Sequence, residues 1–78
     1  MEMKDLIQRI AEALVDNPEQ VTVNAVEGSQ ATILELKVAK EDLGKIIGKQ
    51  GRTAKSIRTI LGAASAKMHR RTLLEIVE

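Results

Sequence analysis

The sequence predicts an α+β domain in which a three-stranded sheet carries its helices on one face. Three observations favour this class. Two segments repeat apolar residues at helical spacing, two short runs alternate apolar and polar residues around a turn, and a third short run is apolar and β-branched. The order is helix, strand, strand, helix, helix, strand. One layer of helices on one sheet is the simplest arrangement that buries these apolar faces.

Residues 3–16 form the first predicted helix. Their apolar side chains recur every three or four positions, at Met3, Leu6, Ile7, Ile10, Ala13 and Leu14. The pair Asn17-Pro18 ends this helix, because proline disfavours the α conformation of the residue before it and cannot continue the hydrogen-bond ladder.

Residues 20–38 predict a β-hairpin. Residues 20–26 and 31–38 each alternate apolar and polar side chains, and residues 27–30 between them have the composition of a turn. In the second run we expect one face to carry Leu34, Leu36 and Val38.

The second half of the chain is compatible with helices on both sides of a glycine-bounded interruption. Residues 40–47 are short and helix-compatible, with two acidic residues at their start. Residues 52–68 predict a longer helix with an apolar stripe at Ala54, Ile57, Leu61, Ala64 and Met68. Residues 72–77 predict the third strand. The sequence does not decide which face of this strand points inward. It is either the face with Leu74 and Ile76 or the face with Leu73 and Val77.

Composition limits the chain to a small domain without disulfides. It has 78 residues, no cysteine and no aromatic residue, and we expect residues 1–78 to form a single domain. The lack of cysteine excludes a thiolate metal site and fits a reducing compartment. No apolar run has the length of a membrane span, and the first residues lack the pattern of a signal peptide. We therefore expect a cytoplasmic protein.

The net charge of +1 conceals a strong separation of charge along the chain. Residues 40–71 hold nine basic and two acidic residues, a local charge of +7, whereas the rest of the chain has a charge of −6. A basic segment in an otherwise acidic chain favours an anionic ligand. The charge distribution therefore predicts a polyanion as the partner.

The segment from Ile46 to Arg52 indicates where this polyanion binds. Gly48 and Gly51 allow a tight turn between two helices and remove side chains that would keep a bulky partner away. The second helix begins directly afterwards, so its free N–H groups and positive dipole end face the loop. Cationic side chains surround this loop: Lys45, Lys49, Arg52, Lys55 and Arg58.

Other glycine motifs fit this segment less well. A phosphate-binding P-loop needs a hydroxyl residue where Gln50 stands, and a dinucleotide fingerprint needs glycine where Ile46 stands. A DNA-reading helix-turn-helix remains an alternative, although the preceding hairpin and the following strand disfavour it. A simple helix-breaking turn is the remaining alternative.

The run Ile46-Ile47-Gly48-Lys49-Gln50-Gly51 resembles the I-I-G-x-x-G signature of the KH domain. The GXXG loop of KH domains clamps about four nucleotides of single-stranded nucleic acid. The order of elements is similar to the type II arrangement, and the resemblance covers essentially the whole chain. Residues 43–54 resemble the small bacterial single-KH-domain RNA-binding proteins that are regarded as RNA chaperones. Ala54 departs from the general KH pattern, since many KH domains carry a larger aliphatic residue there.

The resemblance implies a site for single-stranded RNA. The two glycines would shape the loop, and Lys49 and Gln50 would face the sugar–phosphate chain. Aliphatic side chains would lie beneath the bases in place of aromatic ones, at Ile46, Ile47, Ala54 and Ile57. The implied RNA-binding set is Lys45, Ile46, Ile47, Gly48, Lys49, Gln50, Gly51, Arg52, Lys55 and Arg58.

The resemblance also implies partners and a cellular role. The family acts in post-transcriptional regulation, is linked to cell shape and envelope homeostasis, and pairs with a larger Jag-type KH RNA-binding protein or forms a homodimer. An alternative is that the KH fold serves chiefly as a dimerisation module with little RNA binding of its own. Exposed residues of the last helix and third strand, such as Ser65 and Met68, would then supply the surface.

The remaining polar residues indicate no enzyme. His69 has no cysteine or carboxylate pair to act with, so we expect an ordinary solvated side chain. Glu41 and Asp42 diverge on a helix and are expected to be first-turn charges. Arg70 and Arg71 either extend the basic face or cap the last helix. We expect no catalytic residue, metal, cofactor, small-molecule substrate or membrane.

Overall fold

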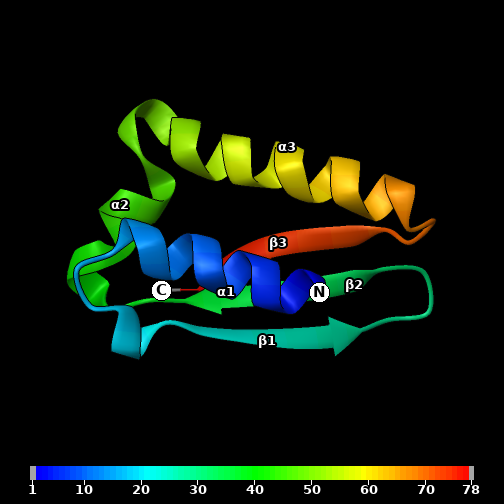
Figure 1. The fold of residues 1–78 in the computed structure, drawn as a ribbon, viewed down its shortest axis with the longest axis horizontal. Coiled ribbons are helices and arrows are strands. Elements are labelled where there is room, and N and C mark those ends of the chain that lie inside the picture. The colour runs from blue at the N-terminus through cyan, green and yellow to red at the C-terminus, as the bar shows by residue number, and fades with distance from the viewer. Residues whose placement is uncertain (1, 78) are drawn as a thin grey trace.

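The computed structural model describes residues 2–77 and has the predicted α+β architecture (Figure 1). Short 3-10 turns lie at Pro18–Gln20, Lys40–Asp42 and Lys49–Gly51. The longer elements are the helices α1 (Met3–Leu14), α2 (Leu43–Ile47) and α3 (Arg52–Lys67) and the strands β1 (Thr22–Glu27), β2 (Thr32–Lys37) and β3 (Thr72–Val77). Their order along the chain confirms the prediction. No helix within the described residues is both long and apolar enough to cross a membrane.

The three strands form one mixed sheet in the order β1-β2-β3. β1 and β2 pair antiparallel, as the hairpin prediction required, and β2 and β3 pair parallel. Figure 1 shows α1 in front of the sheet and α3 running alongside β3, and both helices contribute buried side chains to the same core cluster. α1 contacts β1 and β2, while α3 contacts β3, so the two helices divide one face of the sheet between them.

The core lies between the sheet and the helices and is aliphatic. Every layer contributes to its most buried apolar side chains, which are Ile7, Leu34, Leu36, Ile46 and Leu61. Leu36 on the central strand and Ile46 on α2 have no exposed surface. Because burial of apolar area drives folding, α2 is held in place by the same core that supports α1 and α3.

The register of the parallel pair decides which face of β3 points inward. Leu34 of β2 is buried and lies opposite Leu74. Neighbouring residues in register point to the same face of a sheet, so Leu74 is buried as well, whereas Leu73 is 42% exposed. Of the two faces that the sequence left open, the one with Leu74 and Ile76 therefore faces the helices.

The C-terminal part of α3 differs from the prediction at two positions. Met68 is 60% exposed, which contradicts its place in the predicted apolar stripe but agrees with the surface that the dimerisation alternative requires. Ser65 was expected on that surface but is buried. The Ser65 hydroxyl donates to the carbonyl oxygen of Gly62 at 3.1 Å, which satisfies this polar group inside the structure. The inward stripe therefore continues from Leu61 to Ser65 and not to Met68.

The turn after α3 uses Arg70 as a structural tie. His69 has a left-handed backbone (φ +56°), which lets the N–H groups of His69 and Arg70 donate to the carbonyl oxygens of Ala66 (3.1 Å) and Ser65 (3.0 Å). The Arg70 guanidinium donates to the Thr32 hydroxyl at 3.0 Å and to the Glu27 carboxylate at 3.1 Å. Arg70 thus links this turn to the β-hairpin.

α1 ends two residues earlier than predicted, because a buried carboxylate redirects the chain. Asp42 has no exposed surface. It accepts hydrogen bonds from the backbone N–H groups of Asp16 (3.3 Å) and Asn17 (3.0 Å) and from the Asn17 side-chain amide (2.9 Å).

These contacts also decide the charge state of Asp42. Burial acts to raise the pKa of Asp42, but the hydrogen bonds from Asn17 and Asp16 and the nearby charge of Lys45 outweigh it, so the pKa lies below its ordinary value. Asp42 lies in the first turn of its segment as predicted, but it does more than add a charge there. Its carboxylate also joins the end of α1 to the start of α2.

Candidate nucleic-acid interface

The loop between α2 and α3 turns sharply through residues with positive φ. Gly48 ends α2 with a φ of +78°, and Gly51 precedes α3 with a φ of +75°. Gln50 between them also has a left-handed backbone, with a φ of +57°. The Gly48 N–H donates to the Gly44 carbonyl (2.8 Å), and the Gly51 N–H donates to the Gly48 carbonyl (3.1 Å). These two hydrogen bonds hold the turn closed.

The two glycines are required for different reasons. A Cβ atom on Gly48 would overlap the side chain of Thr53, so a larger residue would displace the start of α3. A Cβ atom on Gly51 would meet no neighbouring atom, and only its positive φ favours glycine. The loop is therefore packed against α3 at its first glycine and has open space beside its second.

Four of the predicted cations surround the start of α3 and are available to a ligand. Lys49, Arg52, Lys55 and Arg58 are exposed, and none of them forms a salt bridge within residues 2–77. The N-cap residue is Gly51, which has no side chain to satisfy the first N–H groups of the 16-residue helix α3. The cations and the helix terminus together favour a bound phosphate.

Lys45 differs from the other predicted cations because it already has a partner. Its Nζ atom lies 3.0 Å from the carboxylate of Asp16, at the end of α1. The hydrogen bond to Asp16 and the negative charge of that residue raise the pKa of Lys45 above its ordinary value. A phosphate would have to compete with Asp16 for this ammonium group, so Lys45 is less available than Lys49.

The expected aliphatic floor is divided between the surface and the core. Ile47 is 40% exposed beside the loop, whereas Ile46 has no exposed surface. Ala54 and Ile57 are also buried, although Ala54 still lines the groove beside α3. Only Ile47 and Ala54 are therefore placed where a base could touch them, and Ile46 and Ile57 support them from beneath.

A groove of about 530 Å³ runs between the helix pair α2 and α3 and the edge strand β3. Its helical side is lined by Leu43, Ile47, Gly51, Ala54 and Arg58, and its strand side by Glu75, Ile76 and Val77. Sequence reasoning missed Leu43 and the three strand residues as parts of the site. Leu43 could have been suspected because it is apolar and close to the glycine motif in the chain. Nothing in the sequence around Glu75, Ile76 and Val77 marks them as parts of a site.

A family model described as "KhpA/KhpB, KH domain" matches residues 4–76. The chain belongs to the KhpA/KhpB KH-domain family. The "RNA-binding protein KhpA" of Clostridium acetobutylicum is 56% identical over 75 residues, which cover 96% of this chain and 100% of the relative. The protein of the same name from Borreliella burgdorferi is 51% identical and is matched over 95% of this chain and 90% of its own length. The predicted family is confirmed.

The same fold occurs in a solved structure of a larger protein. The crystal structure of an Aquifex aeolicus Era variant bound to GDP and aluminium fluoride matches with a TM-score of 0.68, covering 94% of this chain and 28% of the Era chain. At 20% identity this likeness concerns the fold alone. The element order and the mixed three-stranded sheet confirm the predicted type II KH fold.

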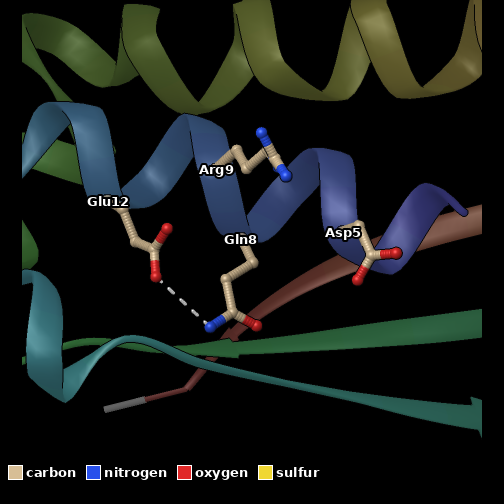
Figure 2. A pocket seen from close by; sticks show the side chains of 4 residues that line it. All are labelled: Asp5, Gln8, Arg9 and Glu12. Carbon is tan, nitrogen blue, oxygen red and sulfur yellow. Dashed lines mark hydrogen bonds between the residues drawn. The ribbon is translucent and has the colours of Figure 1, made fainter. Parts of the chain in front are cut away.

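A separate shallow hollow on the surface of α1 lacks the features of the groove (Figure 2). It is lined by Asp5, Gln8, Arg9 and Glu12, which all come from one helix. The Gln8 amide donates to the Glu12 carboxylate at 3.4 Å, and two acidic residues oppose a single cation. No group of three or more potential metal ligands is brought together within residues 2–77. The KH groove is therefore the better candidate for a ligand site.

Proposed function

We propose that this KH domain binds single-stranded RNA in the groove beside its GXXG loop. The observation that carries the proposal is the pairing of free cations and a helix N-terminus with an aliphatic groove along one edge. Phosphates would lie along Lys49, Gln50 and Arg52, while bases would turn toward Ile47 and Ile76. The name "RNA-binding protein" of the KhpA relatives supports RNA as the ligand.

The groove favours weak binding with little sequence preference. The chain has no aromatic side chain on which bases could stack, so the bases would rest on aliphatic groups while the phosphates supply most of the attraction. Three to five phosphate contacts would give a log–log salt dependence of roughly −2 to −3.5, at about −0.7 per contact.

The double variant Lys49→Asp/Gln50→Asp tests the clamp. Both side chains are exposed, and aspartate tolerates the left-handed backbone of residue 50, so the fold should persist. We expect the variant to lose detectable binding to single-stranded RNA in fluorescence anisotropy titrations, because two carboxylates would face the phosphates. The loss should appear with an unchanged circular dichroism spectrum.

The matched control for this test is Lys4→Asp/Gln30→Asp. It changes the same residue types at exposed positions on α1 and in the hairpin turn, away from the groove. The control should keep its affinity within about twofold, since it removes no predicted phosphate contact. If the folded loop variant binds RNA as well as this control does, the GXXG clamp is wrong.

The proposal extends to a cellular role that rests on the family. The protein would act in the cytoplasm as an RNA chaperone in post-transcriptional regulation, as a homodimer or together with a larger Jag-type KH RNA-binding protein. Cell shape and envelope homeostasis would then depend on it. Crosslinking in cells, followed by sequencing of the attached RNA, is the direct test, and recovery of no RNA above background would contradict this role.

A second candidate function is protein–protein interaction through the KH fold. Three large apolar side chains on α3, its following turn and β3 are exposed: Ile60 at 49%, Met68 at 60% and Leu73 at 42%. The burial of Ser65 removes it from this surface. A concentration series in the analytical ultracentrifuge would detect self-association. This alternative would prevail if dimer-breaking variants lost function while Lys49→Asp/Gln50→Asp kept it.

A further inference from the structure

A second cavity adjoins the groove at the end of the sheet. Its volume is about 560 Å³, and it shares two lining residues, Leu43 and Val77, with the groove beside the GXXG loop. Figure 1 shows α2 at the end of the molecule where β1 begins and β2 ends. The two hollows are therefore neighbours that both border the side chains of Leu43 and Val77.

The lining of this second cavity has the chemistry that a nucleotide requires. Val38, Leu43 and Val77 form apolar walls, and the amide of Gln20 offers both hydrogen-bond donors and an acceptor. Lys37, the last residue of β2, and Lys40 add two positive charges. Among the described residues none that lines this cavity is acidic, whereas the groove itself contains Glu75.

Both lysines of the second cavity are available to a ligand. Lys37 and Lys40 are exposed, and neither forms a salt bridge within residues 2–77. Lys45, on the neighbouring helix α2, is by contrast paired with Asp16. Neither lysine is therefore neutralised by an ion pair within residues 2–77, and both lie directly beyond the groove in which the first nucleotides would be held.

We propose that the second cavity binds the nucleotide next to the tract held by the GXXG loop. The RNA site would then extend beyond the roughly four nucleotides that a KH loop clamps. Val38 and Val77 contact the face of the added base, Gln20 meets its polar edge, and Lys37 and Lys40 neutralise the adjoining phosphates. This inference rests on the proposed RNA-binding function and adds a second subsite to it.

The dependence of affinity on RNA length tests the second subsite. Mixed-sequence tetranucleotides and octanucleotides are titrated by fluorescence anisotropy at several salt concentrations. A four-nucleotide site can bind an octamer in several registers. For that reason alone, the affinity for the octamer should exceed the affinity for the tetramer about fivefold, without any second subsite. This ratio of affinities is the octamer gain. Two added phosphate contacts should raise the gain to about 30-fold and steepen the salt slope by about 1.4, at about 0.7 per contact.

The variant Lys37→Glu/Lys40→Glu should separate the two subsites. We expect it to bind the tetramer within about twofold of the unmodified protein, while the octamer gain falls to about fivefold and the steeper salt slope disappears. The matched control Lys4→Glu/Lys67→Glu makes the same charge change at exposed residues that line neither hollow. This control should keep the full octamer gain.

The outcomes distinguish this inference from the proposed function. The second subsite would be overturned if Lys37→Glu/Lys40→Glu kept the octamer gain of the unmodified protein. It would also be overturned if the control Lys4→Glu/Lys67→Glu lost as much of that gain. Either result would leave the GXXG clamp intact. If the unmodified protein binds neither oligonucleotide, the proposed function fails and the second subsite fails with it. An octamer whose outer bases are abasic should keep the steeper slope but lose part of the gain. Full retention of that gain would overturn the contact with the base.

Discussion

The two turns at the ends of α3 both carry cationic side chains but use them differently. Residues 48–51 precede the helix and residues 68–71 follow it, and both turns are basic and contain left-handed backbone. Beside the first turn, Lys49 and Arg52 form no salt bridge within residues 2–77. In the second turn, Arg70 is held by Glu27 and Thr32.

The difference shows that a distant segment decides whether a cation is available. Arg70 meets Glu27 because the end of the hairpin lies beside the turn between α3 and β3, and Lys45 meets Asp16 because α1 ends beside α2. No acid of those segments pairs with the start of α3 within the described residues. Of the nine cations in residues 40–71, seven form no ion pair within residues 2–77, and four of these seven lie around the GXXG loop and the first turns of α3: Lys49, Arg52, Lys55 and Arg58.

The strongest test of the GXXG end removes the anchor of α2. Asp42→Ala leaves three hydrogen-bond donors of Asp16 and Asn17 without their acceptor. Breaking a buried polar network is among the most destabilising changes, so we expect Tm to fall by about 15 °C. Thermal melts followed by circular dichroism measure this. Glu41→Ala, at the exposed neighbouring carboxylate, should change Tm by only a few degrees, and equal effects of the two variants would contradict the role of Asp42.

Acid should weaken the same anchor. The pKa of Asp42 is lower in the folded protein than in the unfolded chain. The carboxylate therefore stabilises the fold fully at pH values above the pKa of the unfolded state. This stabilisation is lost as the pH falls through the lower pKa of the folded state. The Tm difference between the unmodified protein and Asp42→Asn should stay constant between about pH 5 and 8 and shrink below about pH 4. A difference that grows as the pH falls would contradict the sign of the shift.

Replacing the two glycines of the loop by alanine should destabilise the fold by different amounts. Gly48→Ala forces a Cβ atom against Thr53 in a backbone region that suits glycine, so we expect the free energy of unfolding to fall by about 2–3 kcal/mol. Gly51→Ala meets no neighbouring atom and should cost about 1 kcal/mol, from its positive φ alone. Urea denaturation measures both changes. Equal costs would show that packing against Thr53 does not shape the loop.

Paired arginine variants make the sharpest comparison of the two ends of α3. Arg70→Met should lower the free energy of unfolding by about 1 kcal/mol through its lost exposed ion pair and hydrogen bond, and leave RNA affinity unchanged. Arg52→Met should leave stability unchanged, weaken RNA binding about threefold and reduce the salt slope by about 0.7. Equal losses of RNA affinity would erase the proposed difference between the two turns.

Sequence reasoning located the elements well because their signals are local. The spacing of apolar residues found α1 and α3, and the alternation in residues 31–38 identified the buried face with Leu34 and Leu36. Boundaries were less accurate. The first strand begins at Thr22, two residues later than predicted, because Pro18–Gln20 form a 3-10 turn. α1 ends early because Asp42 binds the backbone beyond it.

The loop of the candidate site could be identified from the sequence, but its surroundings could not. A glycine requirement at residues 48 and 51 is a property of the backbone, so it is visible in the chain itself. The strand wall of the groove, with Glu75 and Ile76, depends on β3 lying beside the helix pair. Ile46 looked like a contact residue because it belongs to the motif, yet its side chain completes the core.

The sequence alone determined the order of elements, the family, the glycine loop and the clustering of basic residues, because each depends on residues close together in the chain. The tertiary structure decided which cations pair with acids, which face of β3 is buried and how the two hollows come to lie side by side at Leu43 and Val77. Each of these depends on contacts between segments far apart in the chain. Strand register and the packing of helices on the sheet create those contacts, and no local pattern specifies either.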